Sequence, residues 1–256
     1  MLRRVHTPRL RTGEIALDPA ASRHVRNVLR LTEGTPVEVF DDAGATAQGE
    51  IVRLAPEVAV RIEALNVPST DRAEMIIASA VPKGDRADWM IEKLSELGCT
   101  RFIPLATARS VVHPEGKNKR DRWTRLATES AKQSRRSGVM RIDDLTPLKA
   151  ALDEAVAGGA PTFVLSTDPG AMPIVAALSG TVSGLRSVTM FIGPEGGWTD
   201  EEIALFGAMG ARGLKLTQTV LRIETAAVAT AAVVAVVLTP LPPPDAADPF
   251  NPRTCA

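Results

Sequence analysis

The alternation of apolar and polar residues divides the chain into a strand-rich first part and a second part in which strands alternate with helices. In the first seventy residues, short alternating runs predict four strands, at 14–17, 36–40, 47–54 and 58–65. Asp18 and Pro19 are typical of a helix start, and residues 20–31 fit one helix. The first part is therefore expected to be a small, β-rich, barrel-like module with one helix.

From residue 75 onward, β-branched and aromatic runs alternate with segments of helical periodicity. The expected strands are 75–81, 101–105, 162–166, 188–192 and 213–216. The expected helices are a segment capped by Gly98, then 122–136, 145–157, 199–209 and 226–238. This order predicts an α/β domain with a parallel sheet, whose ligands bind beyond the carboxyl ends of the strands.

Charge changes the picture only through its distribution, because 30 basic residues balance 30 acidic ones. Residues 1–30 hold seven Arg against two acidic residues, and residues 101–141 hold eleven Lys or Arg against three. These two basic islands favour local contact with a polyanion, with solvated helix faces as the alternative.

Two cysteines, Cys99 and Cys255, are too few for a disulfide framework, and the three histidines lack metal-ligand spacing, so no metal is expected. No secretory signal opens the chain. The apolar stretch 226–238 is shorter than the roughly 20 residues that span a bilayer. A cytoplasmic protein that does not enter a membrane is expected.

Two loops that follow predicted strands carry the candidate chemistry. The first runs Gly193-Pro194-Glu195-Gly196-Gly197, and the segment from Thr199 to Glu202 then supplies an N-cap and an acidic first turn for a helix. The second loop begins at Thr217 and ends in Leu-Arg-Ile-Glu-Thr at Thr225. On residues alone, the first is either a tight turn or a ligand loop, and the second is either a helix cap or part of the same site.

The combination of these loops resembles a known family. Gly-Pro-Glu-Gly-Gly-Trp-Thr-Asp-Glu-Glu, with Leu-Arg-Ile-Glu-Thr-Ala about twenty residues later, is similar to the two signature loops of the RsmE family. Lys-Gly-Asp-Arg at 83–86 and Ala-Arg-Ser-Val-Val at 108–112 extend the match. The family methylates N3 of a uridine in 16S ribosomal RNA with S-adenosylmethionine and has the knotted SPOUT fold.

The resemblance implies a fold and a domain plan. The expected domains are a PUA-like RNA-binding β-barrel at 1–68 and a SPOUT methyltransferase domain at 72–238, a knotted parallel sheet with helices on both faces and a carboxyl-terminal trefoil knot. Residues 239–256 are rich in proline and poor in large apolar residues, so we expect a disordered tail. Enzymes of this class usually dimerise through the knot helices, which implies a homodimer that buries 226–238.

The resemblance also implies roles for individual residues. The cofactor-binding candidates are Leu165, Ser166, Ile192, Gly193, Pro194, Glu195, Gly196, Gly197, Leu216, Leu221, Ile223, Thr225 and Ala226. The RNA-binding candidates are Arg9, Arg23, Arg26, Lys83, Arg86, Gln133 and Arg136, of which Arg23 and Arg26 could equally form a solvated helix face.

Arg222 and Glu224 are the catalytic candidates. Arg222 would stabilise the uridine anion, and Glu224 would act as a base or orient Arg222. A structural ion pair between the two is the alternative.

The chain departs from the family pattern at two places. Thr217 stands where the family commonly has a glycine, and Val139-Met140 stand where the family usually has a proline, shortly after Gln133 and Arg136. The functional alternatives are a related knotted methyltransferase that acts on another RNA, such as transfer RNA, or on a ribose hydroxyl, and a non-catalytic RNA-binding assembly factor.

Overall fold

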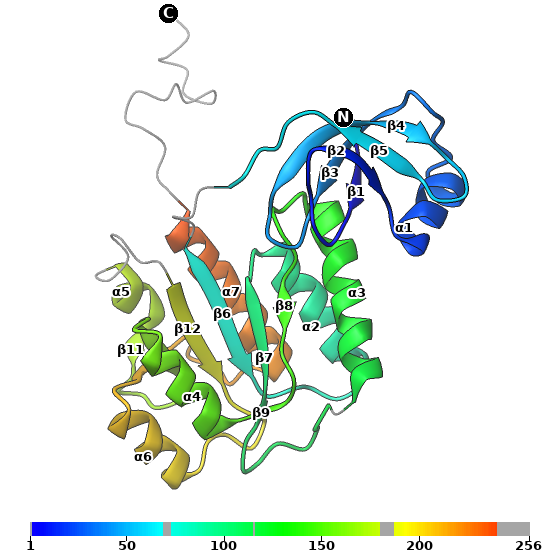
Figure 1. The fold of residues 1–256 in the computed structure, drawn as a ribbon. Helices are drawn as coiled ribbons and strands as arrows, with labels where there is room; N and C mark the ends of the chain where they lie inside the picture. The colour runs from blue at the N-terminus through cyan, green and yellow to red at the C-terminus, as the bar shows by residue number, and fades with distance from the viewer. Residues whose placement is uncertain (1, 69–72, 115, 180–186, 240–256) are drawn as a thin grey trace, which may run out of the picture.

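The computed structural model describes residues 2–68, 73–114, 116–179 and 187–239, and they form two sheets (Figure 1). The first sheet holds five strands: β1 Arg3–His6, β2 Gly13–Ala16, β3 Pro36–Phe40, β4 Thr46–Arg53 and β5 Ala59–Ile62. Its order is β1-β3-β4-β5-β2, with β1 parallel to β3 and the other pairs antiparallel. Their alternating apolar residues close over one core, which confirms the β-rich first part.

The helix of this part begins as predicted but is not one helix over 20–31. Asp18 Oδ1 accepts hydrogen bonds from the backbone N–H groups of the first turn, and Pro19 opens helix α1, Pro19–Arg23. The chain then widens into a π-helical turn, η1 His24–Val28. Arg30 has a φ of 52°, in the left-handed region, and so the segment ends before residue 31.

The second sheet holds strands β6 Glu74–Ser79, β7 Arg101–Ala106, β8 Arg141–Ile142, β9 Thr146–Pro147, β10 Thr162–Leu165, β11 Met172–Pro173, β12 Ser187–Ile192 and β13 Arg212–Lys215. Its order is β11-β13-β10-β12-β6-β7-β8, and β9 also pairs with β7. Every one of these pairs is parallel, as the alternation of strands and helices predicts.

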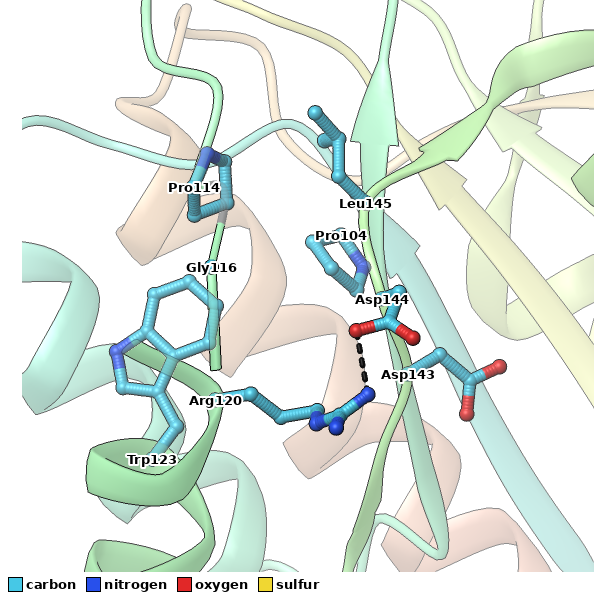
Figure 2. A pocket seen from close by; sticks show the side chains of 8 residues that line it. All are labelled: Pro104, Pro114, Gly116, Arg120, Trp123, Asp143, Asp144 and Leu145. Atoms are coloured by element: carbon cyan, nitrogen blue, oxygen red, sulfur yellow. Dashed lines mark hydrogen bonds and ion pairs between the residues drawn. The ribbon is translucent and has the colours of Figure 1, made fainter. Parts of the chain in front are cut away.

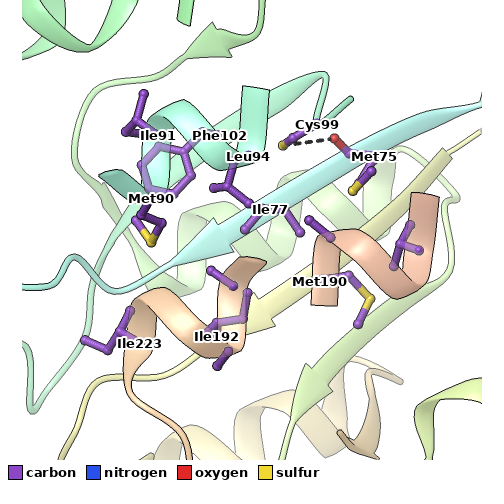
Figure 3. Packing of buried hydrophobic residues seen from close by; sticks show 14 of the residues in the cluster. Met75, Ile77, Met90, Ile91, Leu94, Cys99, Phe102, Met190, Ile192 and Ile223 are labelled. Carbon is purple, nitrogen blue, oxygen red and sulfur yellow. Dashed lines mark hydrogen bonds between the residues drawn. The ribbon is translucent and has the colours of Figure 1, made fainter. Parts of the chain in front are cut away.

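Helices cover both faces of this sheet: α2 Asp85–Glu96, α3 Lys117–Ser134, α4 Leu148–Ala157, α5 Ile174–Ser179, α6 Asp200–Ala208 and α7 Ile223–Leu238. Met75, Ile77 and Met190 point to one face, where they pack with residues of α2 and α7 (Figure 3). Residues of α3 and α5 belong to the same cluster. On the opposite face, Ala78 and Phe191 pack against α4 and α6. Successive strand residues face opposite sides, which is why two separate cores form.

Several elements were not predicted. β8, β9 and β11 have two residues each, too few to show a periodicity, and α5 is a short helix of six residues. β1 was missed because it carries Arg4, whose side chain is only 5% exposed despite its charge. α3 also begins at Lys117, five residues before the predicted start.

Arg4 lies where the amino-terminal sheet meets helix α3. Its Nε donates to Glu38 Oε1 at 2.9 Å, and its Nη1 donates to the carbonyl oxygen of Ala131 in α3 at 2.9 Å. Arg135 donates to the other oxygen of Glu38 at 3.1 Å, and the backbone N–H of Val139 donates to Asp42. These bonds fix the amino-terminal sheet against the end of α3 (Figure 1).

Most of the predicted proline-rich tail, from residue 240 onward, and the boundary between the two predicted domains, residues 69–72, fall outside the described residues. Among the described helices, none combines the length and the apolar character needed to cross a membrane.

Candidate active site

Three loops that carry predicted site residues leave the sheet along one edge. Strands β13, β10 and β12 are adjacent and parallel, so the segments that follow Leu165, Ile192 and Lys215 emerge at the same side. The backbone N–H of Ala80, just after β6, donates to the carbonyl oxygen of Ile192 and ties the next loop to this edge. The fold therefore brings together the residues that the sequence places in two separate loops.

Gly193 and Gly197 of the first loop are required for different physical reasons. A Cβ on Gly193 would lie 2.9 Å from Cε2 of Trp198, so this glycine makes room for the indole ring. That ring donates from Nε1 to the carbonyl oxygen of Leu165 at 3.1 Å. Gly197 has a φ of 70° and open space at its Cβ position, so it permits both the turn and the close approach of a ligand.

The second loop turns back on itself. Leu216 and Leu221 are partly buried and pack against the main core, whereas Val220 between them is 80% exposed. Thr217 Oγ1 donates to the carbonyl oxygen of Thr219 at 2.7 Å. The threonine that replaces the family's glycine is therefore exposed and its hydroxyl closes its own turn.

At the start of α7, Glu224 is a buried carboxylate with one oxygen left over. Oε1 accepts from Nη1 of Arg86 at 3.3 Å, and Oε2 is buried with no hydrogen-bond partner. The residue is 6% exposed overall. Buried carboxylate oxygens normally have a partner, so Oε2 has an unused capacity to accept a hydrogen bond.

Arg222 occupies the N-cap position of α7 and its side chain is exposed. The ion-pair partner of Glu224 is Arg86, from the first turn of α2, rather than Arg222. This arrangement overturns the alternative in which Arg222 and Glu224 form a structural pair. It leaves the Arg222 guanidinium at the positive end of a helix dipole, where it can meet an anionic ligand.

Comparisons with known proteins identify the family of this chain. A family model described as an RNA methyltransferase domain matches residues 69–235, and an RNA methyltransferase PUA domain matches residues 17–62. Ribosomal RNA small subunit methyltransferase E of Bacillus subtilis is 31% identical over 217 residues, which cover 79% of this chain and 82% of that one. The enzyme of the same name from Mycobacterium tuberculosis is 33% identical, with 87% of each chain covered.

The chain belongs to the ribosomal RNA small subunit methyltransferase E family. It is accordingly an RNA methyltransferase, and its fold is the predicted SPOUT class with an amino-terminal PUA domain. A solved structure of methyltransferase E from Neisseria gonorrhoeae, bound to S-adenosyl methionine, is 23% identical, has a TM-score of 0.79 and covers 93% of this chain and 98% of that one. A protein from Legionella pneumophila solved with bound SAM is 26% identical, with a TM-score of 0.77 and coverage of 93% and 97%.

The candidates for RNA contact in this methyltransferase fall into two groups. Arg26 donates to the carbonyl oxygens of Leu54 and Pro56, and Arg136 donates to those of Ser95 and Cys99. Together with Arg86, these arginines hold parts of the chain in place. The other candidates are exposed: Arg9, Arg23, Lys83 and Gln133.

Two cavities lie away from the predicted cofactor residues. One, of about 310 Å³, is lined by Pro104, Pro114, Gly116, Arg120, Trp123, Asp143, Asp144 and Leu145 (Figure 2). Arg120 pairs with Asp144 there, and Asp143 pairs with Arg101 and Arg141. The other, of about 590 Å³, lies at the opposite edge of the sheet, between the two domains. The carboxylates of the first cavity are thus already neutralised within the protein.

Cys99 is fully buried in the main core. Burial raises the pKa of its thiol to about 12, which keeps it protonated. Among the described residues, no group of His, Cys, Asp and Glu side chains could hold a metal ion.

Proposed function

We propose that this protein transfers the methyl group of S-adenosylmethionine to N3 of a uridine in 16S ribosomal RNA, within the small ribosomal subunit. The observation that carries the proposal is the unpartnered oxygen of Glu224, which is buried at the start of α7. Family membership supplies the reaction class, and the named relatives are ribosomal RNA small subunit methyltransferases.

The residues present fit the cofactor. Gly197 has open space at its Cβ position and Glu195 is exposed, so a carboxylate and bare backbone are both accessible to a ligand. Leu216 and Leu221 offer partly buried apolar surface beside it. The proposed cofactor residues remain Leu165, Ser166, Ile192, Gly193, Pro194, Glu195, Gly196, Gly197, Leu216, Leu221, Ile223, Thr225 and Ala226.

The protein's main chemical task in this reaction is to help the acceptor nitrogen lose its proton. When bound, S-adenosylmethionine supplies a methyl group on a positively charged sulfur that leaves as a neutral thioether. Uridine N3 must lose its proton before its lone pair attacks, and Oε2 of Glu224 is the group we propose to accept that proton or its hydrogen bond. Arg222 and the positive end of α7 would stabilise the negative charge on the flanking carbonyl oxygens.

We place the RNA across both domains. Residues 1–68 are proposed as the RNA-binding domain, in which the exposed side chains of Arg9 and Arg23 would contact the RNA. In the methyltransferase domain, the exposed side chains of Lys83 and Gln133 are the proposed RNA contacts. Charged and polar side chains of this kind hold phosphates and set orientation without reading sequence. The proposed place of action is the cytoplasm, where ribosomal subunits are assembled.

We also propose a homodimer through the face formed by α5 and α7. Val236 is 75% exposed and Val175 is 56% exposed, and the helices that carry them contact each other. Burial of such residues by a second copy removes apolar surface from water. Residues 72–238 would form the knotted methyltransferase domain of each copy, and light scattering of the purified protein measures the oligomeric state.

The decisive experiment combines the purified protein, labelled S-adenosylmethionine and small ribosomal subunits that lack the modification. Digestion of the RNA should yield labelled 3-methyluridine. A labelled ribose-methylated nucleoside, or label only in transfer RNA, would contradict the proposal in favour of a related activity. Absence of cofactor binding in calorimetry would favour a non-catalytic assembly factor.

A further inference from the structure

The loop after β7 lies against the glycine loop, residues 193–197, although no residue of the loop after β7 was predicted to bind the cofactor. This β7 loop, residues 107–110, is a tight turn in which the backbone N–H of Ser110 donates to the carbonyl oxygen of Thr107 at 3.2 Å. The hydroxyls of the same two residues lie 2.8 Å apart, and Thr107 N–H donates to Ser110 Oγ. These bonds make the β7 loop a firm support for whatever it contacts.

Arg109 of the β7 loop clamps the backbone of the glycine loop. Its Nη1 donates to the carbonyl oxygen of Gly196 at 2.8 Å and to that of Trp198 at 3.2 Å. A Cβ on Gly196 would lie 3.3 Å from both Cβ and Cδ of Arg109, so the glycine lets the arginine stem lie close to the loop. Gly196 thus has a packing reason that is separate from ligand approach.

Glu202 ties the same two loops from the other side. In the capping box of α6, its Oε2 accepts from Thr199 N–H at 2.9 Å, while Thr199 Oγ1 accepts from Glu202 N–H at 3.2 Å. Its remaining oxygen, Oε1, accepts from the backbone N–H of Ala108 at 2.9 Å. A capping box needs only one of the two oxygens, and here the second one reaches the neighbouring loop.

The indole of Trp198 extends this network to a third loop. Its N–H holds the carbonyl oxygen of Leu165, and its ring packs edge-on against Phe206 with centroids 4.9 Å apart. The same ring fills the space beside Gly193. The backbone between Gly193 and Trp198 is therefore held at both ends and at Gly196.

We propose that Arg109 and Glu202 are positioning residues that hold the glycine loop in its cofactor-binding conformation. This inference rests on the proposed cofactor site. A loop with three glycines in five residues loses much backbone entropy when it is fixed, and a ligand must supply that free energy unless the protein has already done so. By fixing the loop before binding, the clamp improves affinity without touching the cofactor.

The test is calorimetric titration of the full-length protein with S-adenosylmethionine, alongside steady-state kinetics with small ribosomal subunits. Because Arg109→Ala removes two charge-assisted hydrogen bonds, we expect the Kd of the cofactor to rise roughly tenfold to a hundredfold. The kcat at saturating cofactor and the KM for RNA should stay within about twofold. Arg109→Lys should recover little, because an ammonium group lacks the planar fork.

Glu202→Gln provides a second variant with nearly unchanged shape. Its amide can still accept from one backbone N–H but presents a donor to the other, so the Kd of the cofactor should again rise. The matched controls are Arg125→Ala, an exposed arginine of α3 that donates to the backbone of its own helix, and Glu63→Gln, an exposed glutamate of the amino-terminal domain. Hydrogen exchange of residues 193–199 without cofactor should be faster in both clamp variants than in both controls.

Three results would overturn the proposal. A lower melting temperature with an unchanged Kd would make the clamp a matter of stability alone, and a raised KM for RNA with an unchanged Kd would make Arg109 an RNA contact. Unchanged hydrogen exchange of residues 193–199 would remove the positioning role. If the wild-type protein itself fails to bind S-adenosylmethionine, the proposed function fails, whereas the exchange measurement still judges the clamp.

Discussion

Replacing Arg4 by methionine should weaken the contact between the amino-terminal sheet and helix α3. The Arg4 side chain makes one hydrogen bond across the domain boundary, to Ala131 of α3, and a second to Glu38 within its own sheet, and its guanidinium lies 4.1 Å from the centroid of the Phe40 ring. Methionine retains much of the apolar stem but makes none of these contacts. The change also leaves the carbonyl oxygen of Ala131, in the last turn of α3, without this donor.

The magnitude follows from these contacts. A buried hydrogen bond to a charged group contributes about 1.5–3 kcal/mol, and a desolvated cation–π contact contributes about 2 kcal/mol. Burial opposes the charge of Arg4 and lowers its pKa, while Glu38 raises it, so part of the loss is offset when the charge is removed. We expect a net destabilisation of about 2–4 kcal/mol, since Glu38 keeps its ion pair with Arg135.

Urea denaturation followed by circular dichroism measures this free energy of unfolding, with Arg3→Met as the control, because Arg3 is the exposed neighbour on the same strand. In the Arg4→Met variant, the KM for small ribosomal subunits should rise while the Kd of S-adenosylmethionine stays unchanged, because the cofactor loops lie at the carboxyl edge of the other sheet. A loss below about 1 kcal/mol, the size of an exposed ion pair, would contradict the buried role of Arg4.

Two further predictions concern α2. Arg86→Met removes the ion-pair partner of buried Glu224, so kcat should fall by roughly tenfold or more while the Kd of the cofactor changes little. The conservative variant Arg86→Lys should recover part of the rate, and equal activity of the two variants would contradict a role for the ion pair. Burial opposes the ionisation of Asp88, but hydrogen bonds from Arg122 and Trp123 outweigh it and lower the pKa of the carboxyl below 3.8. The stability that the ionised Asp88 contributes is therefore present above pH 3.8 and is lost as pH falls through the lower pKa of the folded state. Asp88→Asn should show a flatter decline of the urea midpoint on acidification than the wild type, and parallel declines in the two proteins would contradict this linkage.

The sequence predicted the elements around the site because local rules and the resemblance agreed there. The strand before Gly193, the N-cap at Thr199 and the acidic first turn of α6 are local features, and the structure has all of them. The order of the parallel strands then brings the two predicted loops to one edge. The α/β architecture was predictable for the same reason, since its helices and longer strands carry clear periodicity.

Long-range partners could not be predicted in the same way. Arg86 and Glu224 are 138 positions apart, and either could equally have been a surface charge. The same holds for Arg4, whose burial depends on α3, and for Gly193, whose small size serves Trp198. Arg109 lay within a segment that resembles the family, but only the structure shows which backbone it holds.

The most direct test of the account is the single-turnover rate of 3-methyluridine formation by Arg222→Ala, with S-adenosylmethionine and small ribosomal subunits both saturating. If Arg222 stabilises the uridine anion, the rate should fall by roughly a hundredfold or more while the Kd of the cofactor stays within about threefold of the wild-type value. An equal loss of rate and of cofactor affinity, or an unchanged rate, would contradict the assignment of this helix start as the catalytic centre.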